Sequence, residues 1–172
     1  MALYALGDKT PTIDPSAFIH PDATIIGNVV IGPESSVWPQ AVLRGDTSGI
    51  IVGARTSIQD GAVIHCIQEH PTMIGDDCVI GHLVHMEGCI VEDCCLIGSG
   101  SIVLHNAIIR TGALVGAAAM VTNNMEVPSR AMALGVPAVI KENRSDPQLI
   151  LLNAAGYVWN AKHFRENLRR ID

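Results

Sequence analysis

Residues 74–103, IGDDCVIGHLVHMEGCIVEDCCLIGSGSIV, decide the fold, because aliphatic residues recur in this stretch at intervals of six. They form two consecutive groups of three: Ile74, Ile80 and Met86, then Val91, Ile97 and Val103. Glycine or an acidic residue follows most of them. An internal repeat of fixed period is the signature of a solenoid, in which each repeat packs on its neighbours.

The same series extends in both directions along the chain. Its other aliphatic members are Ile31, Val37, Leu43, Val52, Ile58, Ile64, Ile109, Val115 and Val121, with a looser first group of Ile13, Ile19 and Ile26. A smaller residue follows four positions later in most hexads, with Val84 as the main exception: Ser35, Ala41, Thr56, Ala62, Cys78, Cys95, Ser101, Ala107, Ala113 and Ala119. One large and one small inward residue per six predict a triangular all-β coil of about 18 residues per turn, with parallel strands about 4.8 Å apart.

Two stretches hold extra residues between one group of three and the next. They are Gly45–Ile51 and Cys66–Met73. In a stack of coils, such insertions are expected to project from the surface as loops, where functional residues concentrate.

The repeat decays after Val121, and a helix is predicted near the C-terminus. Residues 145–148, Ser-Asp-Pro-Gln, combine a capping residue, a proline suited to the first turn and capping-box spacing. The expected apolar stripe facing the coil is Leu149, Leu152, Tyr157 and Phe164, and Gly156 should weaken the helix midway. The prediction is therefore a β-helix domain over residues 1–140 with an α-helix over residues 145–170 packed outside it.

Composition narrows the functional class. The chain of 172 residues has a formal net charge of −6 and scattered basic residues, which disfavours a nucleic-acid partner. No apolar run reaches the roughly 20 residues of a membrane span, and residues 1–20 do not have a signal-peptide pattern, so we expect a cytoplasmic protein without a membrane partner. Five cysteines without a CxxC pair indicate reduced, mostly packed thiols.

Four of the seven histidines fall within 21 residues, and the hexad register orients them. His65 follows inward Ile64, and Glu87 follows inward Met86 one turn later, so both are expected to point outward, one above the other. His85 also points outward, whereas His82 lies on the preceding side of the coil. All four cannot converge within one subunit, but packing between subunits would bring His82 of one chain to the column of the next. Imidazole and carboxylate are zinc ligands, although such residues also occur as solvated or interface side chains.

The chain resembles the γ-class carbonic anhydrases and their short bacterial relatives over roughly residues 10–140. The resemblance rests on Trp38-Pro39 through Arg44-Gly45-Asp46, on Gln59-Asp60-Gly61 with His65, and on Ile80-Gly81-His82 with Gly88-Cys89. It implies a left-handed β-helix, a homotrimer and a lyase that hydrates CO₂ to bicarbonate at a metal between subunits. The metal would be Zn²⁺, with Fe²⁺ or Co²⁺ as alternatives.

The resemblance also implies roles for individual residues. His65 and His82 match the first two of three metal-binding histidines. Gln59 matches the residue that orients the nucleophile, and Arg44 and Asp60 match an intersubunit salt bridge, with Asp46 beside it; a purely structural role in assembly remains open for these residues. In the Cys66–Thr72 loop, Glu69 and His70 are candidates for a proton shuttle, or they are ordinary surface residues without a catalytic role.

The third ligand departs from the family pattern. The family histidine falls five residues after the second, where this chain has Glu87. Glu87 would complete a His₂Glu sphere, His85 would replace it from the other side of Met86, or the metal would be weak or lost. A carboxylate ligand would also raise the pKa of a bound water.

Three other functions remain open from the sequence. A hexapeptide-repeat acyltransferase would use His82 or His105 as a base, a thioesterase would use the same metal site, and a trimeric scaffold would need no metal. The interpretation otherwise leaves His20, His105 and His163 outside the catalytic site.

Overall fold

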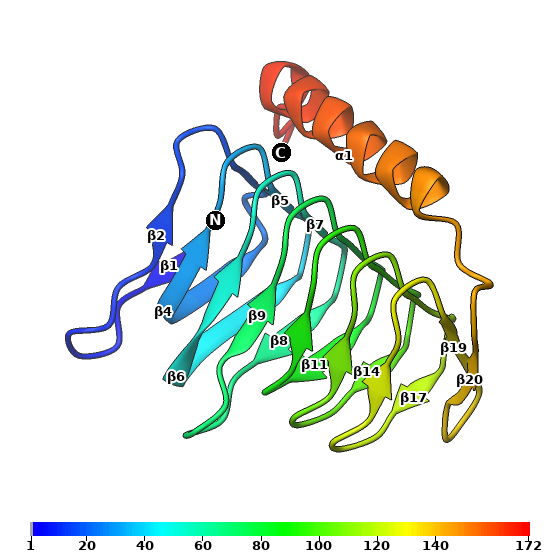
Figure 1. Ribbon diagram of the computed structural model, residues 1–172. Coiled ribbons are helices and arrows are strands. Elements are labelled where there is room, and N and C mark those ends of the chain that lie inside the picture. The colour runs from blue at the N-terminus through cyan, green and yellow to red at the C-terminus, as the bar shows by residue number, and fades with distance from the viewer. Residues whose placement is uncertain (1) are drawn as a thin grey trace.

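The computed structural model, which describes residues 2–172, is a left-handed parallel β-helix with one helix along its outside (Figure 1). The strands stack into three faces that share the coil axis. The first, called the site face, contains the start of β6 (Val42–Val52), β8 (Val63–His65), β11 (His85–Glu87), β14 (Ile102–Val103) and β17 (Met120–Val121). The second face contains the end of β6, then β9 (Thr72–Ile74), β12 (Ile90–Val91), β15 (Ile108–Ile109) and β18 (Glu126–Val127).

The helix face is the third. Its strands are β3 (Phe18–Ile19), β5 (Ser36–Val37), β7 (Ser57–Ile58), β10 (Val79–Ile80), β13 (Leu96–Ile97), β16 (Leu114–Val115), β19 (Met132–Leu134) and β20 (Val139–Lys141). The N-terminal turn adds β1 (Ala2–Tyr4), β2 (Thr12–Ile13) and β4 (Thr24–Ile31). All pairings are parallel except β19 with β20, which closes the far end of the coil.

The hexad residues fill the interior as predicted. From Ile31 to Val121, every aliphatic member of the series is buried, and so are the small residues at the corners. Each large side chain contributes about 1.5–3 kcal/mol through removal of its apolar surface from water. Four of the five free cysteines belong to this core, and burial raises the pKa of the Cys89 thiol to about 12.

Three details differ from the prediction. In the first turn Ile25, not Ile26, points inward, because Ile25 pairs with inward Leu43. The stretch Gly45–Ile51 is not a loop but part of the 11-residue strand β6, which pairs with β4 across a register shift between Gly27 and Val29. The repeat also continues for one turn beyond Val121, with Val127 and Ala133 buried.

The Cys66–Met73 insertion does project from the coil. An antiparallel bridge between Ile67 and His70 closes its tip as a short hairpin. The hairpin leads directly out of β8 and into β9, so it lies between the site face and the second face.

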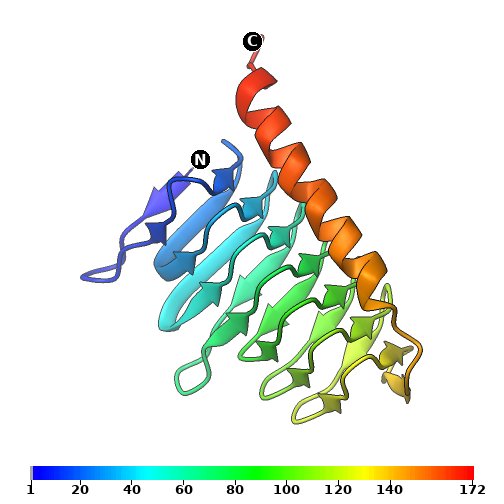
Figure 2. The same ribbon diagram turned by 45° about the horizontal axis from the view of Figure 1, so that its top comes forward.

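The helix α1 (Pro147–Asn167) runs along the helix face and contacts β3, β5, β7 and β10 (Figure 2). Asp146, rather than Ser145, caps it by accepting a hydrogen bond from the backbone N–H of Gln148. The predicted stripe is partly wrong, because Leu149 and Leu152 point to solvent. The inner side carries instead three buried residues and two aromatic rings: Ile150, Ala154, Ala161, Tyr157 and Phe164. Within residues 2–172, no helix combines the length and apolar character needed to cross a membrane.

Two glycines give a matched test of this packing. A Cβ on Gly98 would lie 2.5 Å, 2.7 Å and 2.8 Å from backbone atoms of the next turn, whereas a Cβ on Gly156 in α1 would meet open space. We expect Gly98→Ala to lower the free energy of unfolding by about 1–3 kcal/mol through overpacking. Gly156→Ala should raise it by about 0.5–1 kcal/mol through helix propensity. Chemical denaturation measures both, and a Gly98→Ala protein as stable as the wild type would contradict the close approach of the coils.

Candidate metal centre

Glu87 lies directly above His65 on the site face. The two residues are register partners in the β8–β11 ladder, and 3.6 Å separates Nδ1 of His65 from Oε2 of Glu87. Thr72 fixes the ends of both strands, because its buried hydroxyl donates to the His65 carbonyl and accepts from the Gly88 N–H. The outward column that the hexad register predicted is therefore present.

Asp46 holds His65 from below. Its Oδ1 lies 2.8 Å from Nε2 of His65, and its Oδ2 pairs with Arg44, the register neighbour of His65. Burial alone would raise the pKa of Asp46, but the hydrogen bonds from His65 and Arg44 lower it below its ordinary value. A carboxylate only accepts, so Nε2 of neutral His65 carries the proton and the lone pair on Nδ1 faces Glu87.

The strand that carries Asp46 is anchored from outside the coil. The ammonium group of Lys9 donates to the carbonyl oxygens of Asp46 and Thr47, at 2.7 Å each. This contact ties the N-terminal hairpin, closed by the Leu6–Lys9 bridge, to β6. Because Asp46 lies in a strand held at both ends, its carboxylate is presented to His65 in a fixed direction.

His105 is a member of this cluster that the sequence interpretation left outside the site. It follows β14 by two residues, one turn above Glu87, and its Nε2 lies 2.7 Å from Oε1 of Glu87. Its Nδ1 lies 3.3 Å from Nδ2 of Asn123, one further turn above. The hexad pattern held no signal for this contact, because His105 is at a corner, where the register does not fix the side-chain direction.

His85, the alternative third ligand, also points outward from β11. Its Nε2 lies 3.9 Å from Oε1 of Glu87, and 41% of its side chain is exposed. Glu87, which is the more enclosed of the two, is the one whose second oxygen faces His65.

His82 lies at the opposite edge of the site face, at the corner that leads into β11. Its Nδ1 lies 3.0 Å from Oδ2 of Asp60, which occupies the same corner one turn earlier. Gln59 precedes Asp60 and is buried, and no hydrogen bond from its side chain to another described residue is found. Tyr157 of α1 lies near this corner, where burial and then the charge of Asp60 raise its pKa.

The predicted residues therefore form two separate groups. The proximal group is Arg44, Asp46, His65 and Glu87, and the distal group is Gln59, Asp60 and His82. His82 lies at the corner before β11 and pairs with Asp60, whereas Glu87 ends β11 and faces His65 and His105, so no ion pair joins the two groups within the described chain. Consistently, residues 2–172 of a single chain contain no cluster of three or more His, Cys, Asp or Glu side chains that could hold a metal.

The proximal group nevertheless fits two of the ligands of one metal ion. Ligands with bonds of about 2.0–2.1 Å in a tetrahedral arrangement lie about 3.3–3.4 Å apart, close to the 3.6 Å between Nδ1 of His65 and Oε2 of Glu87. Both atoms present lone pairs to each other, which is unfavourable unless a cation or a proton lies between them. Asp46 supplies the outer carboxylate that typically orients a metal-binding histidine.

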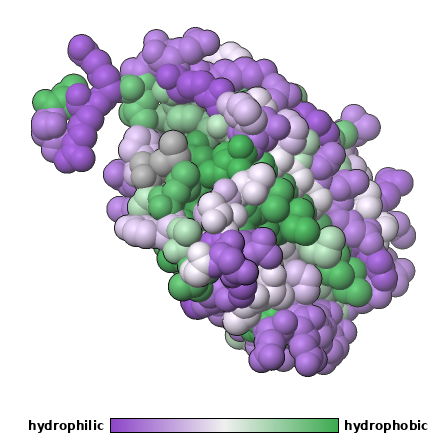
Figure 3. All heavy atoms as spheres, turned by 90° about the vertical axis from the view of Figure 1, so that its left-hand side faces the viewer, coloured by the Kyte–Doolittle hydropathy of each residue, from purple (hydrophilic) through white to green (hydrophobic). Residues whose placement is uncertain are grey.

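The site face is apolar between the two groups. The outward column of register partners consists of Val42, Val63, His85, Ile102 and Met120. Val63 is 40% exposed, and a sheet face with such outward side chains is typical of a surface that another protein covers. Apolar side chains also gather on the side of the molecule seen in Figure 3.

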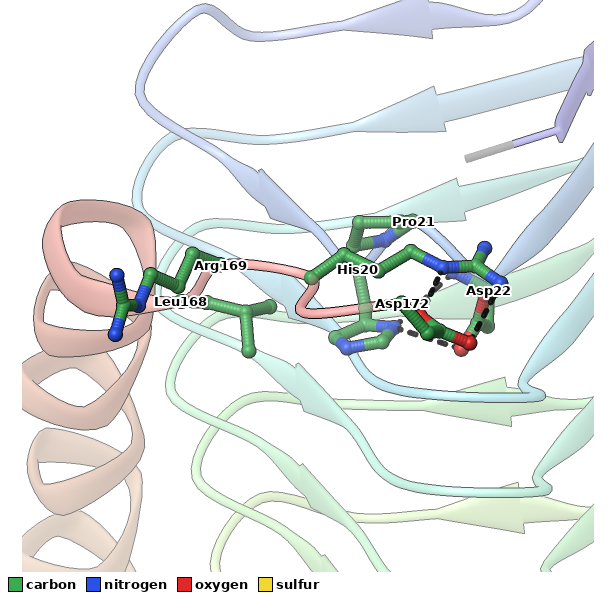
Figure 4. Close-up of a pocket in the computed structure, with 7 residues that line it drawn as sticks. His20, Pro21, Asp22, Leu168, Arg169 and Asp172 are labelled. Carbon is green, nitrogen blue, oxygen red and sulfur yellow. Dashed lines mark hydrogen bonds and ion pairs between the residues drawn. The ribbon is translucent and has the colours of Figure 1, made fainter.

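The larger cavities of the single chain lie elsewhere. One open cavity of about 430 Å³ is lined by the corner His20–Asp22 and by C-terminal residues, where Asp172 lies beside His20 and Asp22 (Figure 4). No residue of the proximal or distal group lines it. The cavity forms where the end of the chain folds over the first turn, so it does not identify the metal centre.

Comparison with known proteins gives one family throughout. The description of bacterial transferase hexapeptide repeats (six repeats) matches residues 10–45. Over 96% of this chain, the sequence is 38% identical to γ carbonic anhydrase 1, mitochondrial, of Arabidopsis thaliana, and the chain spans 63% of that protein's length. The carnitine operon protein CaiE of Escherichia coli K12 is 34% identical over 87% of this chain and 76% of CaiE. A solved hexapeptide transferase family protein from Anaplasma phagocytophilum is 32% identical, with a TM-score of 0.91 over 95% of this chain and 98% of that chain.

Proposed function

We propose that this chain, which belongs to the hexapeptide-repeat family that includes the γ carbonic anhydrases and CaiE, binds a divalent metal between subunits and hydrates CO₂ to bicarbonate. The observation that carries the proposal is the 3.6 Å distance between Nδ1 of His65 and Oε2 of Glu87, which suits two ligands of one metal ion. His82 lies at the other edge of the same face.

A homotrimer would bring the two groups together. Each chain has one proximal and one distal edge, so head-to-tail contacts close into a ring in which every contact is equivalent. The triangular coil and the implied family assembly favour three subunits. In that ring, His65 and Glu87 of one chain meet His82 of the next, and the apolar column of the site face is removed from water.

Within this site each residue has a separate task. His65, Glu87 and His82 would hold the metal, which is Zn²⁺ in our proposal, with Fe²⁺ or Co²⁺ as alternatives, and three protein ligands are the number typical of a catalytic zinc site. Asp46 fixes the tautomer of His65, and Arg44 holds Asp46. Gln59, which is buried and directly precedes Asp60, would orient the nucleophile beside His82. Arg44 and Asp60 would form the salt bridge across the contact.

Zinc in carbonic anhydrases lowers the pKa of a bound water to about 7, and the same metal would supply a hydroxide nucleophile for CO₂ here. Glu87 adds a negative charge to the ligand set, so we expect the activity to require a higher pH than a site with three histidines. Glu69 and His70, in the hairpin beside the site, are the groups proposed to pass protons to solvent. Five free cysteines suit a reducing compartment such as the cytoplasm.

The first test measures metal content together with CO₂ hydration. The wild type should bind about one metal per subunit and lose activity on chelation, because three ligands come from each contact. His65→Ala and His82→Ala should each empty the site. Glu87→Ala should empty it as well, whereas His85→Ala should keep the metal; the reverse result would make His85 the third ligand. A wild-type protein without bound metal would contradict the proposed function.

The second test asks whether the ligands come from two chains. His65→Ala and His82→Ala chains are co-expressed, so that mixed rings contain one contact with both histidines intact. Random assembly of equal amounts predicts recovery of about one quarter of the wild-type metal content. Recovery would not occur if His65 and His82 of the same chain shared the ion, so absence of metal from the mixed protein would contradict an intersubunit site.

One observation favours a second candidate, an acyltransferase. His82 and Asp60 form a histidine–carboxylate pair with the geometry of a general base and its orienting group. Such an activity would transfer an acyl group to a hydroxyl or amine and would survive chelation, since no metal takes part. Loss of acyl transfer in His82→Ala, but not after chelation, would distinguish it from CO₂ hydration.

A further inference from the structure

We infer that His105 is a positioning residue for the metal site. Asn123 holds His105, and His105 in turn restrains one carboxylate oxygen of Glu87, so that the other oxygen faces His65 as a monodentate ligand. The inference rests on the proposed metal site and explains how a glutamate can stand where the family has a histidine.

The direction of the hydrogen bonds follows from the side chains involved. Nδ2 of Asn123 can only donate, so Nδ1 of His105 accepts at 3.3 Å. The proton of neutral His105 is therefore on Nε2, which lies 2.7 Å from Oε1 of Glu87. Glu87, His105 and Asn123 lie on three successive turns of the coil and thus form one chain of side-chain contacts.

Glu87 needs this restraint more than a histidine would. A glutamate has three rotatable side-chain bonds, and a free carboxylate can bind a metal through one oxygen or both. With Oε1 occupied by His105, only Oε2 remains directed at Nδ1 of His65, 3.6 Å away. By restraining Oε1, His105 would keep Glu87 from binding the metal through both oxygens.

The contact with His105 would also reduce the negative charge that the Glu87 carboxylate brings to the metal. An N–H group placed 2.7 Å from Oε1 would compete with the metal for the carboxylate electrons. In this way His105 compensates for the departure at Glu87: the ligand set has a carboxylate in place of an imidazole, and an imidazole contacts that carboxylate from the next turn.

The test compares metal binding by His105→Ala, His105→Gln and Asn123→Ala trimers with the wild type. Competition with a chromophoric chelator measures affinity, and the visible absorption spectrum of the Co²⁺-loaded protein reports coordination geometry. We expect His105→Ala to weaken metal binding by about 10–100-fold and to change the Co²⁺ spectrum, because groups that orient a ligand typically have effects of this size. Asn123→Ala should have a smaller effect of the same kind.

His105→Gln supplies the rescue, because its amide N–H can still donate to Glu87, so affinity should return toward the wild type. The matched control is His163→Ala, which removes a histidine that stacks on Trp159 of α1 and contacts no residue of the metal centre; it should bind metal as the wild type does. His105 lies at a corner and only 31% of its side chain is exposed, so thermal unfolding of each variant is measured to verify that the coil is intact.

The outcomes separate the two claims. A wild-type trimer that binds metal, together with a His105→Ala trimer of unchanged affinity and Co²⁺ spectrum, overturns the positioning role and leaves the proposed function standing. A wild-type trimer that binds no metal overturns both. Loss of affinity in His105→Ala without recovery in His105→Gln also contradicts the restraint of Glu87, because it assigns the effect to the imidazole itself.

Discussion

Side chains on the outside of this protein are held about 4.8 Å above their counterparts in the preceding turn, because successive turns are joined by parallel β-sheet hydrogen bonds. The inward hexad residues enforce this spacing, since a slip by one residue would bring the aliphatic side chains out of the core. The vertical column of Arg44, His65 and Glu87 is a direct consequence. The proposed pair of metal ligands, His65 and Glu87, thus lies on neighbouring turns of the regular coil.

The fixed register of the coil brings His65 and Glu87 together but keeps His82 of the same chain away from them. His82 lies at the corner that leads into β11, and Glu87 lies at the end of β11, so the two side chains are at opposite edges of the site face. The apolar column between the edges gives a second chain an energetic reason to bind there. In the proposed trimer, the contact that covers this face would also bring His82 of the next chain to His65 and Glu87, so assembly would complete the metal site.

The sequence predicted the features that follow from the repeat. The inward residues from Ile31 to Val121 and the stacking of Glu87 on His65 were available from spacing, because hydrophobic burial fixes the side-chain alternation along a strand. Features that depend on other contacts were missed. Gly45–Ile51 joined a strand because glycines allow β4 and β6 to approach closely, with Gly27 and Gly45 at the contact.

The misses at the helix and at His105 have related causes. On α1, apolar residues occupy the outer as well as the inner side, so periodicity alone could not identify the stripe that contains Ile150 and Ala154. His105 stands at a corner, where backbone torsion rather than strand alternation aims the side chain. Its contact with Glu87 depends on how this corner stacks one turn above β11.

The central claim is that a metal ion lies at each contact between subunits. Anomalous X-ray diffraction from crystals of the metal-loaded trimer, measured on both sides of the metal absorption edge, tests it most directly. The account predicts three equivalent anomalous peaks per trimer, each between His65 and Glu87 of one chain and His82 of the next. Peaks that lie within a single chain, or a trimer without any peak, would contradict it.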